Sequence, residues 1–161
     1  MPLRCLPDVN VWVALLDEAH VFHTQALAFI QRKRLKIATC ALVESGVVRV
    51  PNLPGYSRLG PVGFAAVAAK LAEICGSLDH EFWPCDVSLR EAGRVHWPRV
   101  MGHNQITDVY LLALAVARQG CLVTLDHGVA LTTVPGAMPR HLEHLQRAGG
   151  HGTVDAINAK R

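Results

Sequence analysis

The sequence predicts a single α/β domain, a three-layer α/β/α sandwich with a central and mostly parallel sheet. Short apolar segments alternate along the chain with longer stretches of helical periodicity, which is the pattern of successive β–α units. Half of the 161 residues are apolar and 18% are charged, a composition that favours a compact fold and argues against disorder. The length suits one hydrophobic core, and we assign residues 1–147 to this domain.

The first half of the chain contains two expected strands and four expected helices. The strands cover residues 3–7 and 35–39, and the helices cover residues 9–16, 23–34, 40–50 and 61–77. Between the last two helices, residues 51–61 hold three prolines and two glycines, which indicates a loop. Pro61 suits the first turn of the helix that follows, and Gly76 suits its C-terminal end.

The second half continues this alternation of strands and helices. We expect a strand at residues 81–86, a helix at 88–97 that Pro98 stops, a loop at 101–107, a helix at 108–120, a strand at 121–126 and an edge strand at 138–145. Thr107 suits the N-cap of the helix at 108–120, and Gly120 suits its C-terminal cap. Residues 148–161 lack apolar periodicity, and we expect them to form a flexible C-terminal tail.

Four acidic residues lie where this architecture would gather them. Asp8 and Asp126 each end an apolar segment that we expect to be a strand. Asp108 begins an apolar helix, and Glu44 lies about one turn into another. Ligands bind to parallel α/β sheets outside the carboxyl ends of the strands. We therefore expect the four carboxylates to converge at this edge of the sheet.

A bound cation would stabilise such a convergence of carboxylates. Two carboxylates about 4 Å apart repel by roughly 4 kcal/mol at an effective dielectric constant near 20. Mg²⁺ and Mn²⁺ prefer oxygen ligands, and in such a site they activate water and stabilise the charge of a reacting phosphate. Single acids also have ordinary structural interpretations: Asp8 as a helix N-cap, Asp108 as a first-turn residue and Asp126 as part of a turn. Their joint placement favours a metal site for phosphoryl transfer.

Three uncharged polar residues accompany the acids. Asn10 follows Asp8 by two positions, Thr124 precedes Asp126 by two, and Asn104 lies in the loop before Asp108. Their side chains are suited to hydrogen-bond the carboxylates or a metal-bound water. For Asn10, helix capping is an equally compatible role.

The charge distribution is that of a protein that binds a polyanion around an acidic pocket. The chain has 16 basic and 13 acidic residues, and setting aside the four candidate acids leaves nine acidic residues. Basic residues cluster at 32–36, where they also suit a helix C-terminus, and again at Arg90, Arg94 and Arg99.

The cysteines and the N-terminus indicate a cytoplasmic protein. The five cysteines form no CxxC pair, so we expect no zinc site and a reducing compartment. No apolar run approaches the ~20 residues that span a bilayer, and acidic residues interrupt the N-terminal segment where a signal peptide would be apolar. We therefore expect no membrane association.

The acidic motifs together resemble those of a known family. The segments PDVNVWVALL, ALVESGVVRV, NQITDVYLLALA and LVTLD, in this order and spacing, resemble the PIN-domain ribonucleases. They are more closely similar to the VapC toxins of bacterial toxin–antitoxin modules. The likeness covers about residues 3–145. It matches the four acids to the family's acidic metal-site positions, and it matches Asn10, Thr124 and Asn104 to polar positions beside that site.

The resemblance implies an activity and partners. Members of this family are endoribonucleases that depend on Mg²⁺ or Mn²⁺ and commonly cut structured RNAs such as tRNA or rRNA. They usually form homodimers, and a small antitoxin, here a VapB-like protein, inhibits them by reaching toward the acids. We expect the same of this chain.

Other functions are compatible with parts of this pattern. A haloacid-dehalogenase-like phosphatase needs an aspartate two residues after the first, where this chain has Asn10. A phospho-receiver domain needs a late lysine, but none lies between Lys70 and Lys160. A nuclease that acts on DNA would use the same metal chemistry. The main alternative is a PIN-like module that binds RNA or protein without catalysis, and the intact set of acids argues against it.

Overall fold

A five-stranded parallel sheet forms the centre of the computed structural model, which describes residues 2–146. The strand order is β3-β2-β1-β4-β5. The strands are β1 (Cys5–Pro7), β2 (Lys36–Cys40), β3 (Asp79–Trp83), β4 (Cys121–Thr124) and β5 (Leu142–His144). All four strand pairings are parallel, so the carboxyl ends of the strands share one edge. The α/β class and the parallel sheet are therefore confirmed.

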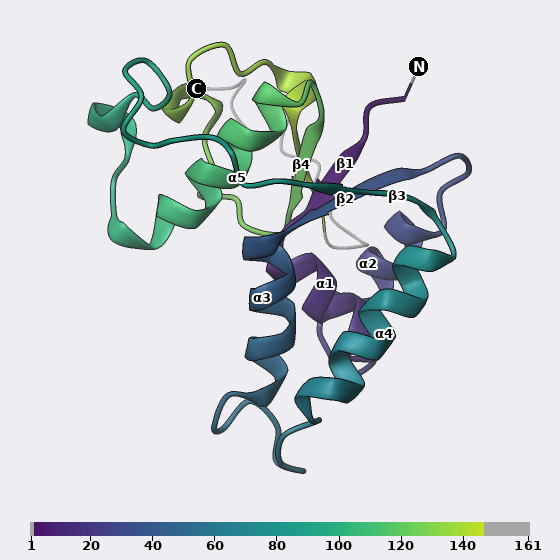
Figure 1. The fold of residues 1–161 in the computed structure, drawn as a ribbon. Coiled ribbons are helices and arrows are strands. Elements are labelled where there is room, and N and C mark those ends of the chain that lie inside the picture. Colours follow the sequence, from purple (N-terminus) through teal and green to yellow (C-terminus); the bar gives the residue numbers. More distant parts are fainter. Residues whose placement is uncertain (1, 147–161) are drawn as a thin grey trace, which may run out of the picture.

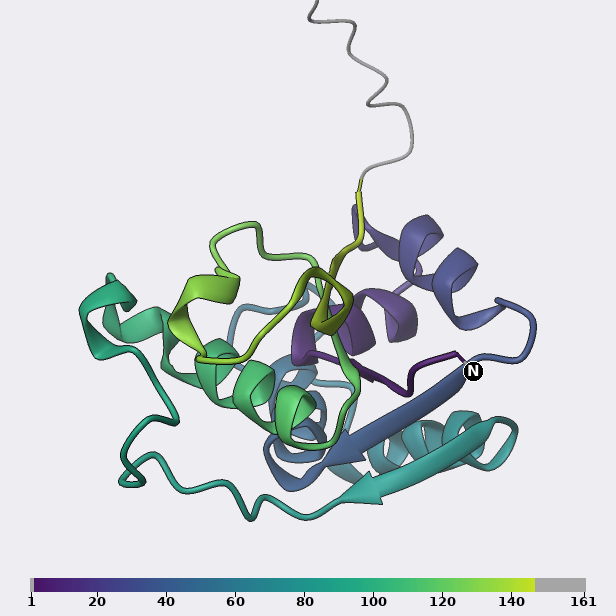
Figure 2. The same cartoon turned by 90° about the horizontal axis from the view of Figure 1, so that it is seen from above.

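Within residues 2–146, five α-helices cover the two faces of the sheet, which confirms the three-layer sandwich. They are α1 (Val9–Leu16), α2 (His23–Ile30), α3 (Ala41–Arg49), α4 (Phe64–Gly76) and α5 (Ile106–Ala117). Helices α1 to α4 lie together on one side of the sheet and α5 lies on the other side (Figure 1). The view from above shows the same separation, with α5 beside the C-terminal segments and away from α2 (Figure 2).

The core follows the alternation of side chains along the central strands. Leu6 and Leu122 belong to the larger apolar cluster, which includes the buried residues of α5, whereas Cys5 and Val123 belong to the cluster beneath α1 and α2. Successive residues of a strand point to opposite faces, so β1 and β4 contribute to both clusters. In α5, seven consecutive residues from 109 to 115 are buried, because this helix is covered by the sheet and by the segments that follow β4.

One predicted helix is wrong. Residues 89–94 form turns and bends, and a short 3-10 helix follows at Trp97–Arg99 with Pro98 inside it instead of ending a helix. Within 88–97 the one buried hydrophobic residue is Val95, so this segment has no apolar helical face to bury. Gly93 has a φ of 81°, which an α-helix does not accommodate.

One predicted cap is also wrong. Helix α5 begins at Ile106 with Gln105 as the capping position, so Thr107 lies inside the helix. The C-terminal cap predicted for Gly120 is present: its N–H donates to the carbonyl of Ala115 (2.8 Å), and Gln119 before it has the left-handed conformation (φ 52°). Gly120 is also required by packing, because a Cβ there would clash with the ring of Trp83 and would lie 2.7 Å from the carbonyl oxygen of Arg4.

Several boundaries differ from the prediction by a few residues. Helix α2 ends at Ile30 rather than at 34, α4 begins at Phe64 rather than at 61, and β3 covers Asp79–Trp83 rather than 81–86. The edge strand is short and follows a 3-10 helix at Pro139–His141. Residues 148–161 lie outside the described residues, so the expected tail remains a prediction. Among the residues that the structure describes, no helix is long and apolar enough to cross a membrane.

Candidate functional site

Asp8 lies at the junction between β1 and α1. Its backbone N–H donates to the carbonyl of Val123 (2.9 Å), which continues the pairing of β1 with β4 by one residue. Its Oδ1 accepts a hydrogen bond from the N–H of Val11 (2.8 Å), so Asp8 is the N-cap of α1. The side chain is almost fully buried, with 2% of its surface exposed. The structural role expected for Asp8 is therefore present, and it fixes the carboxylate at the edge of the sheet.

Thr124 connects Asp8 to Asp126. The Thr124 hydroxyl donates to Oδ2 of Asp8 (2.5 Å) and accepts a hydrogen bond from the backbone N–H of Asp126 (2.9 Å). Thr124 ends β4, the strand next to β1, and is fully buried. One buried hydroxyl thus orients one acid and positions the backbone of the other.

Asp126 lies in the turn that follows β4. Its Oδ1 accepts a hydrogen bond from the N–H of Gly128 (2.7 Å), and the residue is exposed. Gln105 holds the same turn from the other side of the site, because its Nε2 donates to the carbonyl of Gly128 (3.1 Å). Its Oε1 accepts a hydrogen bond from the N–H of Met101 (2.8 Å). Gln105 therefore links the loop before α5 to the turn that carries Asp126.

The sequence motifs pointed to Asn104 and not to its neighbour Gln105. Asn104 is exposed, and no hydrogen bond of its side chain occurs among the described residues. Asn10 is likewise exposed in the first turn of α1. No local signal distinguishes Gln105 from Asn104, because the partners of Gln105 include a residue 23 positions away.

The charges of three aspartates act on one another. The pKa of Asp108 is raised from 3.8 to about 6, mainly by burial and in addition by the negative charges of Asp8 and Asp126. Burial also raises the pKa of Asp8, and Asp126 adds to this effect, whereas the hydrogen bonds from Thr124 and Val11 oppose it. Asp8, Asp108 and Asp126 thus form a common field of negative charge at the carboxyl edge of the sheet.

Glu44 occupies a different part of this edge. It lies in the first turn of α3, where its Oε1 accepts a hydrogen bond from the hydroxyl of Thr39 (2.6 Å). Thr39 is in turn 2.8 Å from Nε2 of His80. Burial lowers the pKa of His80 and raises that of Cys75; the charge of Glu44 opposes the first effect and adds to the second. Glu44 does not figure among the charges that act on Asp8 or Asp108. The structure therefore brings the three aspartates together and places Glu44 beside β2, β3 and α4.

The acids fit a hydrated divalent cation better than a dehydrated one. Within residues 2–146, no group of three or more potential ligand side chains is arranged to hold a metal ion. Mg²⁺ usually keeps several waters and binds one or two carboxylates directly. The negative charges of Asp8 and Asp126, which add to burial in raising the pKa of Asp108, are charges that such an ion would offset.

A pocket of about 520 Å³ lies elsewhere, between α1, α2 and α4. Its lining is largely apolar and includes Leu15, Leu27, Ile30, Ile74 and Leu78, and none of the four candidate acids contributes to it. The acids instead lie at the carboxyl ends of the strands: Asp8 and Asp126 follow β1 and β4, and Glu44 and Asp108 lie in the first turns of α3 and α5.

Known proteins are similar to this chain over most of its length. The PIN domain family matches residues 5–134, a range that contains all four acids. Three ribonucleases of Mycobacterium tuberculosis are also similar. VapC44 is 43% identical over 144 residues, which cover 89% of this chain and all of that protein. VapC29 is 38% identical over 128 residues (80% of this chain and 90% of that protein), and VapC39 is 34% identical over 129 residues (80% and 92%).

These similarities agree with the parallel sheet and with the acidic edge described above. They also cover the segments that carry the predicted motifs. The chain is therefore a PIN-domain protein and belongs to the VapC family of ribonuclease toxins, the family that its acidic motifs predicted.

Proposed function

We propose that this ribonuclease is an endoribonuclease that depends on Mg²⁺ or Mn²⁺ and hydrolyses phosphodiester bonds of structured RNA, such as tRNA or rRNA. Its catalytic and metal-binding acids are Asp8, Glu44, Asp108 and Asp126. The observation that carries the proposal is the mutual effect of three aspartates at the carboxyl edge of the sheet, where the pKa of Asp108 rises to about 6. Isolated surface carboxylates do not show such a shift.

Each side chain has a distinct task in this proposal. Asp8, Asp108 and Asp126 hold the cation, directly or through its waters, and Glu44 holds a water or the ion from the side of α3. When bound, the cation supplies an activated water and offsets the charge that develops on the phosphate. Thr124 keeps the Asp8 carboxylate oriented, while Asn10 and Asn104 are available to hydrogen-bond waters or RNA.

The proposed partners follow from family membership. A small VapB-like antitoxin would inhibit the enzyme in a type II toxin–antitoxin system, and two copies of the chain would form a homodimer. The surplus of basic residues outside the acidic site supports binding of RNA, because Lys and Arg attract phosphates over several ångströms.

The test is induction of the chain in a bacterial host, wild type beside Asp8→Asn, with the 5′ ends of total RNA mapped. We expect growth arrest and discrete new 5′ ends with the wild type alone. The purified proteins are then compared on the identified RNA with Mg²⁺, with Mn²⁺ and with EDTA. Wild-type protein that is folded and binds RNA, but leaves it intact with either metal, would refute the proposal and indicate the non-catalytic binding module.

A further inference from the structure

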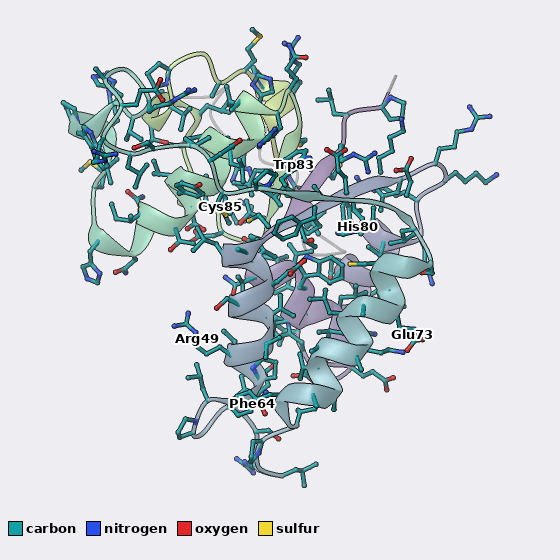
Figure 3. All side chains as sticks on the ribbon, viewed as in Figure 1. Arg49, Phe64, Glu73, His80, Trp83 and Cys85 are labelled. Atoms are coloured by element: carbon teal, nitrogen blue, oxygen red, sulfur yellow. The ribbon has the colours of Figure 1, made fainter. Side chains whose placement is uncertain are left out.

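A chain of two hydrogen bonds connects Glu44 to the sheet. Glu44 lies in α3, Thr39 in β2 and His80 in β3, so the chain joins three elements. The Thr39 hydroxyl lies 2.6 Å from Oε1 of Glu44 and 2.8 Å from Nε2 of His80. Thr39 is fully buried, and the two ionisable residues are half-buried. His80 lies on β3 above helices α3 and α4 in the view of Figure 3.

The chemistry of the three groups fixes the direction of both hydrogen bonds. An ionised carboxylate only accepts, and a hydroxyl has one proton to donate. Thr39 therefore donates its proton to Glu44, and His80 must carry a proton on Nε2 and donate it to the Thr39 oxygen. The imidazole donates through Nε2 whichever other contacts it makes.

This arrangement leaves one oxygen of Glu44 free. Oε1 accepts the Thr39 proton, and no described group donates to Oε2. No described lysine or arginine forms an ion pair with Glu44. Burial lowers the pKa of His80, so the neutral imidazole anchors the chain without adding a positive charge beside the site. The carboxylate is thus held by one oxygen and open at the other.

We infer that Thr39 and His80 are positioning residues that hold the Glu44 carboxylate with Oε2 available to the proposed metal or to one of its waters. This inference rests on the proposed function, in which Glu44 belongs to the site. A free glutamate side chain loses conformational entropy when it becomes ordered. Because Thr39 and His80 order it beforehand, metal binding need not do so, and this raises the affinity.

A purely structural role for the same bonds would have a different signature. If Thr39 and His80 only joined β2, β3 and α3, their loss would lower the melting temperature and leave metal affinity unchanged. A positioning role predicts the opposite: loss of these bonds would mainly weaken metal affinity and would change the melting temperature less. The conservative variants Thr39→Ser and His80→Gln keep a hydroxyl and an Nε2 donor respectively, so each is a matched control for Thr39→Val and His80→Leu.

The experiment measures Mn²⁺ binding to the purified full chain, prepared without metal, by titration calorimetry and by the electron paramagnetic resonance of free Mn²⁺. We expect Thr39→Val and His80→Leu to weaken binding about 10-fold or more, as does removal of groups that orient ligands in other metal sites. Thr39→Ser and His80→Gln should bind nearly as the wild type does. Glu44→Gln and Asp8→Asn give the reference losses for the acids.

The outcomes separate this inference from the proposed function. Unchanged affinity in Thr39→Val, with weakened affinity in Glu44→Gln, overturns the positioning role and leaves the site intact. Unchanged affinity in both Glu44→Gln and Asp8→Asn overturns the site and, with it, the inference. The ¹⁵N shifts of His80 in the wild-type protein provide a test that needs no variant. Protonation at Nε2 supports the chain of bonds, and a neutral ring protonated only at Nδ1 overturns it.

Discussion

Thr124 donates its hydroxyl proton to the carboxylate of Asp8, which lies 116 positions earlier in the chain. Thr124 ends β4, and Asp8 directly follows β1, the neighbouring parallel strand, so the sheet itself brings the two residues together. Because the same hydroxyl accepts the N–H of Asp126, a single buried side chain couples the geometry of two acids.

Replacing Thr124 by valine should therefore impair both metal binding and stability. Valine has nearly the shape of threonine but leaves Asp8 Oδ2 and the N–H of Asp126 without this partner. We expect a loss of about 10- to 100-fold in Mn²⁺ affinity and cleavage. The free energy of unfolding should fall by about 1–3 kcal/mol. Calorimetric titration and urea denaturation measure the two effects. Thr124→Ser is the control, and equal affinities in the valine and serine variants would contradict the coupling.

At Asp8, an asparagine should remove activity without removing the helix cap. Asparagine is as good an N-cap as aspartate, and its carbonyl oxygen can still accept the N–H of Val11. Because burial disfavours the charged aspartate, Asp8→Asn should melt no lower than the wild type in EDTA, while RNA cleavage is abolished. Asp8→Ala should lose about 1 kcal/mol from the missing cap and melt lower. A large loss of melting temperature in Asp8→Asn would indicate a mainly structural role.

The raised pKa of Asp108 predicts an unusual dependence of stability on pH. The folded protein binds the proton of Asp108 more tightly than the unfolded chain does, since the pKa rises from 3.8 to about 6. The contribution of Asp108 to the free energy of unfolding is fully present below pH 4 and is lost as the pH rises through 6. Allowing for screening of the half-exposed side chain, the effect is on the order of 1 kcal/mol.

Melting temperatures between pH 4 and 8 in EDTA, compared between wild type and Asp108→Asn, measure this contribution. The wild type should lose more stability than Asp108→Asn between pH 4 and 7, and Mg²⁺ should restore it above pH 6, where the carboxylate is ionised. Parallel pH profiles for the two proteins in EDTA would contradict the assigned shift.

The contact between α1 and α3 requires a glycine. A Cβ on Gly46 would lie 2.5 Å from Cγ2 of Val9, the residue that follows Asp8. Gly46→Ala should therefore push α3, which carries Glu44, away from α1 and lower the free energy of unfolding by about 1–3 kcal/mol. The double variant with Val9→Ala should recover part of this loss, which chemical denaturation would detect.

Gly76→Ala is the matched control for Gly46→Ala. No atom lies within 4 Å of a Cβ at Gly76, so alanine there should be neutral or stabilise the protein by up to about 1 kcal/mol. Equal stability of Gly46→Ala and the wild type would show that Val9 moves aside freely.

Much of the acidic site could be predicted because its signals are local. Asp8 and Asp126 each follow an apolar strand, and Asp108 begins an apolar helix, so parallel topology alone brings them to one edge. The segment at 88–97 shows where local reasoning fails. Its polar residues and Gly93 carry no core-facing pattern, and its conformation depends on contacts such as the hydrogen bond from the N–H of His96 to the carbonyl of Thr133.

The sequence by itself determined the α/β class, the parallel sheet and the family, and it predicted acids at the edge of that sheet, since periodicity and motif spacing are local properties of the chain. Only the tertiary structure decided which polar side chains orient those acids. Gln105 reaches a turn 23 positions away, Thr39 meets His80 from the neighbouring strand, and Gly120 makes room for Trp83. Such contacts depend on strand order and on how closely the elements pack, and a short stretch of sequence contains no signal for either.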